Sequence, residues 1–179
     1  SPEDEATLRS RLGQDPLRPD ASPVRAFEAL RRGRLPLAAA LLDQERIAGV
    51  GNILRAEALF LARLPPLRPA SELSLADFER LWEALQRLME DAARDGRIVT
   101  PGAPPAPWET PGRRREDRFC VYDREGQPCP RCATPISRVA LAGRGLFFCS
   151  GCQTPGAHGR REHTASVEQR KVMEHAPKA

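Results

Sequence analysis

Apolar positions recur at helical spacing in three stretches of the N-terminal part of the chain. In the first, Ser22 precedes Pro23, which predicts a helix start because serine is a common N-cap and proline suits the first helical position. Phe27 and Leu30 form the apolar face of this short helix, and Gly33 is expected to close it.

The second stretch contains two apolar runs separated by glycines. The first run follows Pro36 (Leu37, Leu41, Leu42), the pattern breaks at 49–52 (GVGN), and it resumes at Ile53, Ala56, Leu59 and Phe60. This predicts two helices joined at a glycine-bracketed turn, a helix–turn–helix in the loose sense. We expect Asn52 at the N-cap of the second helix, where free N–H groups and the helix dipole favour a phosphate. The alternative, that Asn52 only caps its own helix, stays open.

The third stretch predicts one long amphipathic helix. Ser74 with Asp77 three residues later resembles a capping box, and Gly96 is a suitable end. We interpret Trp82 and Met89 as core residues rather than a cofactor site. The apolar stripe comprises Leu75, Phe78, Leu81, Trp82, Leu85, Leu88, Met89 and Ala92.

Beyond the third helix the pattern becomes irregular and rich in proline. A strand is expected at FCVY (119–122), leading into a cysteine-rich segment. All three histidines (His158, His163, His175) lie in the weakly apolar end of the chain and are interpreted as tail residues, not ligands. The pattern divides the chain into an interdomain linker (1–20), a helical domain (21–100), a Pro/Arg-rich linker (101–118), a zinc finger (119–153) and a flexible tail (154–179).

The cysteine-rich segment has the spacing C-x2-C-x16-C-x2-C. Two such knuckles bring four thiolates into the tetrahedron that Zn²⁺ prefers, and four sulfur ligands leave no open position for catalysis. The insert suits a β-hairpin with arms PISRVAL and LFFCS and turn AGRG. Two disulfides or an iron–sulfur cluster are the competing interpretations. The predicted ligands of one structural zinc ion are Cys129, Cys132, Cys149 and Cys152, and the remaining Cys120 is expected to be a half-buried strand residue.

Composition and charge narrow the class of partner. The 179 residues contain no apolar run of about 18, the length a membrane span needs, and no signal-peptide pattern, which predicts a soluble cytosolic protein. The net charge is +4, but residues 111–170 contain eleven arginines against six carboxylates. Guanidinium groups fit phosphates well, so an anionic partner is favoured over a merely solvated surface. Arg144, between two glycines at the hairpin tip, can approach a nucleic-acid backbone or can simply be a polar tip residue.

The segments DQERIAGVGNILRAEALFLA and CVYDREGQPCPRC…AGRGLFFCSGCQ, in this order, resemble the bacterial formamidopyrimidine-DNA glycosylase and endonuclease VIII family. The first is similar to its helix–two-turns–helix signature and the second to its C-terminal zinc finger, and RREDRFCVYDREGQPC is closer to the actinobacterial endonuclease VIII branch. The resemblance covers roughly residues 10–153. It implies a mainly α fold with a small β zinc module: a helix–two-turns–helix bundle followed by a zinc-ribbon β-hairpin finger.

The resemblance also implies a function. Family members extrude oxidised bases from double-stranded damaged DNA, cleave the glycosidic bond and nick the strand. Residues matching Asn52 and Arg144 grip phosphates around the lesion, so these two, with Gly49 and Gly51 of the turn, are the candidate DNA-binding residues. Leu146 departs from the threonine of many members, which removes a polar contact near the backbone.

Catalysis in the family uses the amine of an N-terminal proline, with a glutamate and a lysine on an N-terminal β-sandwich. Here Ser1 precedes Pro2, so the proline nitrogen is an amide, and we interpret Pro2-Glu3 as coincidence. We therefore expect the DNA-binding portion of a base-excision-repair glycosylase/AP lyase without its catalytic domain, acting as a monomer in the bacterial cytoplasm at the nucleoid. The alternatives are a free-standing, non-catalytic zinc-ribbon nucleic-acid binder and a zinc-stapled protein-interaction module.

Overall fold

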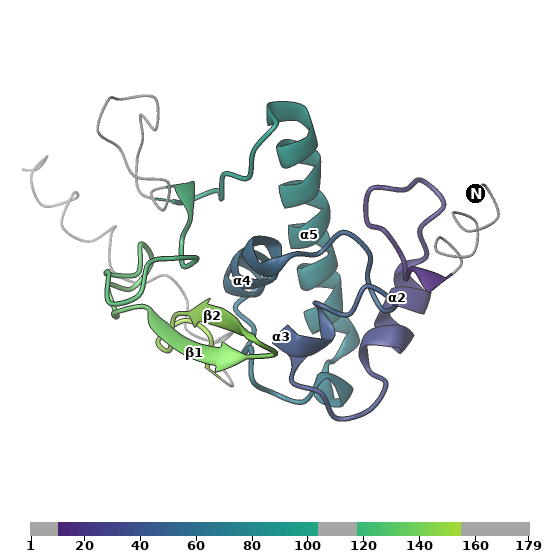
Figure 1. Cartoon of the computed structure of the whole chain (residues 1–179), viewed down its shortest axis with the longest axis horizontal. Helices are drawn as coiled ribbons and strands as arrows, with labels where there is room; N and C mark the ends of the chain where they lie inside the picture. The colour runs from purple at the N-terminus through teal and green to yellow at the C-terminus, as the bar shows by residue number, and fades with distance from the viewer. Residues whose placement is uncertain (1–10, 104–117, 155–179) are drawn as a thin grey trace, which may run out of the picture.

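The computed structural model describes residues 11–103 and 118–154, which form a helical bundle with a two-stranded hairpin against one side (Figure 1). The predicted fold class, mainly helical with a small β module, is confirmed. The elements are α2 (Pro23–Leu30), α3 (Leu37–Ala40), α4 (Asn52–Leu61), the 3₁₀ turn η1 (Ala70–Glu72), α5 (Leu75–Asp95), β1 (Ser137–Leu141) and β2 (Arg144–Phe148).

The predicted helix ends are mostly correct. The Ser22 hydroxyl accepts from the Arg25 amide at the start of α2, and the Ser74 hydroxyl accepts from the Asp77 amide at 3.1 Å at the start of α5. Gly96 ends α5 in the left-handed conformation, with φ +67°. Trp82 and Met89 are buried as predicted, whereas Leu75, the first residue of α5 and of the apolar stripe, is 55% exposed.

The first helix of the predicted glycine-bracketed pair is shorter than its pattern suggests. α3 is a single turn, and the chain then winds through turns from Leu41 to Val50 before α4 begins. Leu41 is nevertheless fully buried. The apolar spacing therefore predicted correctly that this residue is buried, but not how long the helix is. FCVY is not a strand either: within 119–122 the backbone is irregular, and its amides donate to a side chain of α4 described below.

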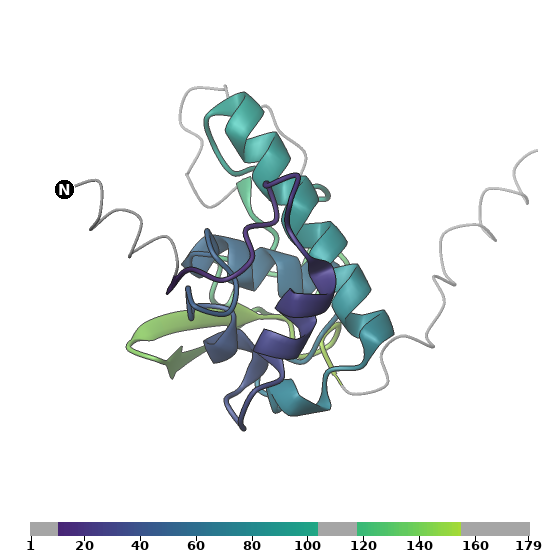
Figure 2. The same cartoon turned by 90° about the vertical axis from the view of Figure 1, so that its right-hand side faces the viewer.

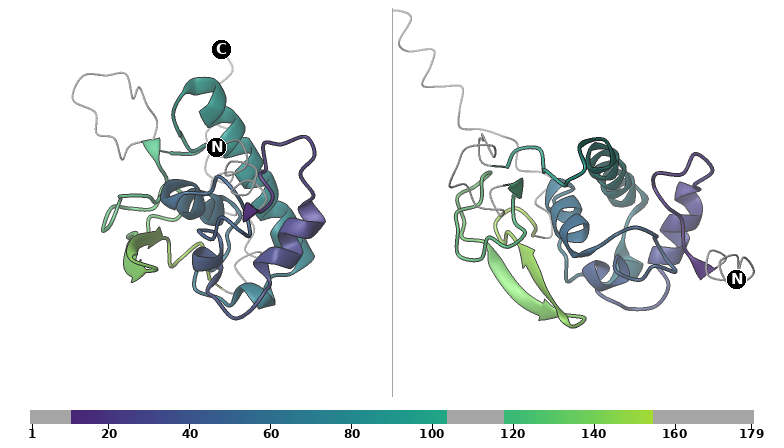
Figure 3. Two further views of the ribbon diagram at one scale, coloured as in Figure 1. Left: turned by 45° about the vertical axis from the view of Figure 1, so that its right-hand side comes forward. Right: turned by 45° about the horizontal axis from the view of Figure 1, so that its top comes forward.

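α4 is enclosed by two hydrophobic cores. Leu54 and Leu59 face the helical core made with α2, α3 and α5, whereas Ala56 and Phe60 face a second core that contains the cysteines. All residues from Leu54 to Phe60 are therefore buried, including two that carry charge. The views in Figure 3 show the hairpin on one side of the bundle and the N-terminal segment with α2 on the other.

The hairpin closes on a two-residue turn. Leu141 pairs with Arg144, and the two residues between them, Ala142 and Gly143, both have positive φ (51° and 71°). Positive φ at both positions is what a type I′ turn requires, and this turn fits the right-handed twist of the two strands. The four-residue turn AGRG was therefore too long, because Arg144 and Gly145 already belong to β2. In Figure 2 the hairpin extends past the helices, with its turn outermost.

No helix within the described ranges is both long and apolar enough to span a membrane.

Candidate functional site

The four predicted metal ligands meet at the base of the hairpin. The Sγ atoms of Cys129, Cys132, Cys149 and Cys152 all lie within 4.8 Å of one another. Two separations are 3.4 Å (Cys132–Cys149) and 3.9 Å (Cys129–Cys152). A tetrahedron with Zn–S bonds of roughly 2.3 Å has edges of about 3.8 Å, so the thiols fit one zinc ion. The burial of three of them (Cys129, Cys149 and Cys152) and the mutual distances of all four support a structural site.

The protonation of these thiols shows why a cation suits them. Burial works against the thiolate of Cys132, yet hydrogen bonds with Thr134 and neighbouring thiols lower its pKa to about 6. Burial raises the pKa of Cys149 to about 11 and also raises that of Cys152. Four thiolates so close together repel one another, and a divalent ion supplies the charge that allows all four to ionise.

The knuckles are fixed to α4 and to the loop that follows it. Arg131, between the first two cysteines, stacks over the Phe60 ring at 4.4 Å and donates to the Phe60 carbonyl. The buried Gln153 accepts from the Cys149 amide at 2.9 Å and donates to the Leu64 carbonyl at 3.1 Å. The metal site and the helical bundle are thus one packed unit.

A groove of about 500 Å³ runs between the α4 turn and the hairpin tip. It brings three of the four predicted DNA-binding residues together: Gly49 and Gly51 on one wall and Arg144 on the other. The full lining is Leu42, Gln44, Gly49, Val50, Gly51, Ala142 and Arg144.

Asn52, the fourth predicted residue, lies directly beside this groove and connects its walls. Its Nδ2 donates to the Gly145 carbonyl of β2 at 3.1 Å, and its Oδ1 accepts from Arg55. The N-cap position predicted for Asn52 is occupied by Gly51 instead, and Asn52 is the first residue of α4. Its side chain is therefore free of capping and links the helix to the finger.

The glycines of the turn have different reasons to be glycine. Gly49 has φ +83°, and a Cβ there would lie 2.8 Å from the Met89 side chain, so the fold itself requires glycine. Gly51 has an ordinary φ, and a Cβ there would meet nothing within 4 Å. The missing Cβ at Gly51 leaves the backbone open to a close approach from the groove. Gln44 fixes the turn by accepting from the Gly49 amide and donating to the Val50 carbonyl.

The hairpin presents Arg144 outward and buries its neighbour. Arg144 is exposed at the start of β2, whereas Leu146, two residues on, is fully buried in the helical core. The departure from threonine noted at Leu146 thus has a structural consequence, since an apolar side chain docks the hairpin on the bundle. Phe147 points the opposite way, into the core with the cysteines.

Sequence reasoning missed Glu57, a fully buried carboxylate of α4. Its two oxygens accept from the amides of Cys120, Val121 and Tyr122 at 2.9, 2.9 and 2.7 Å. Burial raises its pKa, and these three donors oppose that rise. A charged residue inside an apolar helical run, three before Phe60, was the available signal. Cys120, expected to be half-buried in a strand, is instead fully buried in this loop.

We expect Glu57→Gln to loosen the finger from α4. A carboxamide oxygen can accept two of the three amides, and the third is left buried without an acceptor, which lowers the free energy of unfolding by about 1–3 kcal/mol at neutral pH.

The raised pKa of Glu57 means that its carboxyl group binds a proton more tightly in the folded chain than in the unfolded chain. The contribution of this carboxyl group to the free energy of unfolding therefore falls as pH rises from the ordinary pKa of glutamate to the raised pKa of the folded state. Glu57→Gln, which cannot titrate, lacks this pH dependence. Denaturant unfolding across pH, with the exposed Glu79→Gln as control, measures both. Equal stability of Glu57→Gln and the parent chain would contradict this role.

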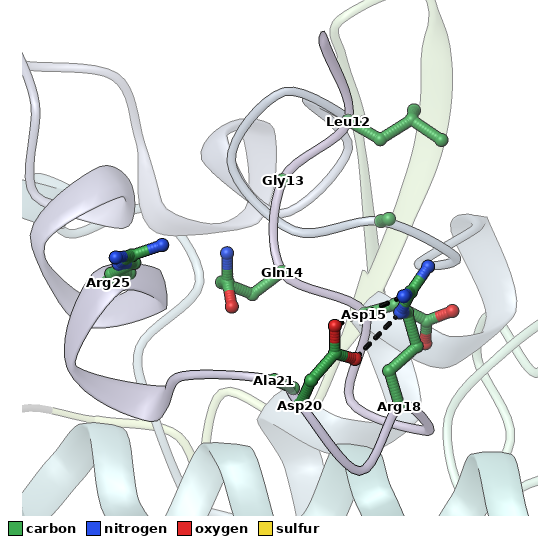
Figure 4. A pocket seen from close by; sticks show the side chains of 9 residues that line it. Leu12, Gly13, Gln14, Asp15, Arg18, Asp20, Ala21 and Arg25 are labelled. Atoms are coloured by element: carbon green, nitrogen blue, oxygen red, sulfur yellow. Dashed lines mark hydrogen bonds and ion pairs between the residues drawn. The ribbon is translucent and has the colours of Figure 1, made fainter. Parts of the chain in front are cut away.

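A second hollow, of about 340 Å³, lies between the N-terminal segment and α2, away from the hairpin (Figure 4). Asp20 and Arg18 pair there at 2.9 Å, and Gln14 and Arg25 line the same space. Its charges are mixed, and none of the predicted site residues lies in it.

Comparison with known proteins assigns both parts of the chain. Residues 12–101 match the formamidopyrimidine-DNA glycosylase H2TH domain, and residues 126–155 match the zinc finger found in FPG and IleRS. The formamidopyrimidine-DNA glycosylase of Thermus thermophilus is 42% identical over 85% of this chain and 57% of its own length. Endonuclease 8 1 of Mycobacterium bovis is 40% identical over 83% of this chain and 56% of its own length. The chain thus spans about half the length of the curated relatives it matches.

Solved structures agree with the sequence relatives. A complex between the Lactococcus lactis Fpg and DNA containing an abasic site superposes with a TM-score of 0.68 at 25% identity, covering 86% of this chain and 55% of that one. The order of elements, the four-cysteine cluster and these matches lead to one assignment. The chain belongs to the formamidopyrimidine-DNA glycosylase and endonuclease VIII family, and it carries that family's H2TH domain and a zinc finger whose four cysteines can bind one zinc ion.

Proposed function

We propose that this chain is the DNA-binding portion of a base-excision-repair glycosylase/AP lyase that acts on oxidised bases and abasic sites in double-stranded DNA. The observation that carries the proposal is the groove in which Arg144 of the finger faces Gly49 and Gly51 of the α4 turn. Two modules that are far apart in sequence thereby place a cation and open backbone at one site, which suits a phosphate.

The roles within the site follow from its chemistry. Arg144 is exposed and donates through a planar fork that matches phosphate oxygens. Asn52 uses one of its two amide hydrogens on Gly145, which leaves the other for a phosphate oxygen. Contacts of this kind position the duplex without reading its sequence, as a repair enzyme that meets lesions in any context requires.

The relatives support the same partner. The Lactococcus lactis Fpg structure contains DNA with an abasic site, and another neighbour, a MutM structure, contains DNA with carbocyclic 8-oxo-G. We propose damaged duplex as the partner here too, and a monomer at the nucleoid in the bacterial cytoplasm as the working form. For the described residues we propose the DNA-binding role, because the two parts of the family that they match are the H2TH domain and the zinc finger.

The test is fluorescence anisotropy of the zinc-loaded chain with a labelled duplex that carries a tetrahydrofuran abasic-site analogue, beside the matched undamaged duplex. We expect tighter binding to the first, and affinity that falls about tenfold or more between about 50 and 200 mM salt, because neutralised phosphates release counterions. Salt-independent or absent binding would contradict the proposal and favour a protein-interaction module. Borohydride treatment of the chain with natural abasic DNA tests catalysis separately, and a covalent adduct would show that these residues are themselves catalytic.

A further inference from the structure

Arg55 connects three elements of the site from a fully buried position. Its side chain is 0% exposed and lies beneath the N-terminus of α4. One terminal nitrogen donates to the Ala38 carbonyl of α3 at 3.3 Å. The other donates to Asn52 Oδ1 and, at 3.3 Å, to the Gly145 carbonyl of β2. A single guanidinium thus joins α3, Asn52 and the hairpin.

The charge of Arg55 is not balanced by the fold. Among residues 11–103 and 118–154 no carboxylate pairs with it, and its Nε has no hydrogen-bond partner. Burial and the neighbouring Arg144 lower its pKa to about 10, so it remains a cation at neutral pH. A buried cation without a counter-ion costs stability, and an apolar side chain of similar volume generally packs as well or better. Packing alone therefore does not account for arginine at this position.

Arg55 also determines how Asn52 is presented. A guanidinium only donates, so the atom of Asn52 that faces it must be the carboxamide oxygen. The carboxamide nitrogen then faces the hairpin, where it donates to the carbonyl of Gly145, the residue next to Arg144. Without Arg55 the carboxamide can flip or rotate, and Gly145 keeps only one of its two donors.

We propose that Arg55 is a positioning residue of the phosphate site, which orients Asn52 and the hairpin backbone and whose unbalanced charge is neutralised when a DNA phosphate enters the groove. This inference rests on the proposed function and deepens it. It makes the site a pair of cations at different depths: the exposed Arg144 contacts the ligand, and the buried Arg55 acts through Asn52 and through its field in a low-dielectric setting.

The experiment is a double-mutant cycle on binding to the abasic-analogue duplex, with Arg55→Met, Asn52→Ala and the double variant, each loaded with zinc. Methionine fills the space without charge. We expect Arg55→Met to keep or raise the melting temperature of the free chain, yet to weaken DNA binding about tenfold. The double variant should lose clearly less affinity than the product of the two single losses, because part of the Arg55 effect passes through Asn52.

Arg124→Met is the matched control. Arg124 is also buried and bonds to carbonyls of the loop 119–128, but it lies outside the groove, so its effect on DNA binding should add to that of Asn52→Ala. Unchanged affinity of Arg55→Met, or additivity of Arg55→Met with Asn52→Ala, would overturn the proposal. So would affinity lost only in proportion to lost folding, since that is what a purely structural arginine produces. An Asn52→Ala chain that binds as the parent does would also overturn the proposal, whereas a parent chain that does not bind DNA at all shows that the proposed function itself fails.

Discussion

Removal of zinc is expected to unfold the finger and abolish specific DNA binding together. The cysteine core is small, and Cys129, Cys149 and Cys152 are buried in it, so without the ion their thiolates repel one another or must take up protons. The hairpin then loses its base, Leu146 leaves the helical core, and Arg144 and Gly145 are no longer held at the groove. We expect a lower melting temperature and an affinity for the abasic-analogue duplex that falls at least about 100-fold, which corresponds to about 2.7 kcal/mol.

A strong chelator followed by zinc addition measures this effect, with circular dichroism for folding and anisotropy for binding. Cys149→Ser should reproduce the loss and should not recover on zinc addition. Cys120→Ser is the matched control, because its thiol lies against the Pro101 carbonyl and outside the four-sulfur cluster, so one zinc per chain should remain. A Cys149→Ser chain that binds DNA as the parent does would show that the metal site is not needed to hold the groove.

Replacement of Arg144 by alanine is expected to weaken DNA binding by about 10- to 100-fold while leaving the fold intact. A charge-assisted hydrogen bond is worth about 1.5–3 kcal/mol, and this side chain is exposed, so little packing is lost. Removing it also relieves the repulsion that Arg55 experiences, which favours the folded chain. The slope of log affinity against log salt should become shallower by about one, since one phosphate contact is lost.

The matched control for Arg144 is Arg25→Ala, which removes the same charge from an exposed position on α2, on the opposite side of the molecule from the hairpin. It should leave both affinity and salt slope close to those of the parent chain. Equal effects of the two variants would show that net charge, rather than the groove, determines binding.

Much of the fold follows from local chemistry that the sequence displays. The serine caps of α2 and α5, the left-handed Gly96 and the cysteine spacing are each decided by a few neighbouring residues, and each was predicted correctly. The length of α3 and the irregular backbone of residues 119–122 were not predicted correctly, because both depend on contacts with residues distant in sequence. An apolar spacing cannot distinguish a helix from buried turns, and FCVY forms no ladder because the Glu57 carboxylate takes its amides.

The candidate site shows the same division. Residue types and motifs pointed to Asn52 and Arg144 singly, but only the three-dimensional structure shows that Asn52 bonds to Gly145, the residue next to Arg144. Glu57 and Arg55 were missed because a charged residue in an apolar helix is normally expected on the face exposed to solvent. From Leu54 to Phe60, however, every residue of α4 is buried. Their roles arise from segments that lie about 60 to 90 residues away in sequence.

The enclosure of α4 between two cores has a consequence for how a duplex must be accommodated. With Leu146 in one core, Phe147 in the other and Gln153 bonded to Leu64, the finger has no hinge on the helices. The spacing of the phosphate ligands is then set before any ligand arrives. On the proposed function, the DNA must therefore bend to bring its phosphates to these residues. A duplex with a gap or a missing base bends at a lower elastic cost than an intact duplex, so it fits the site more readily.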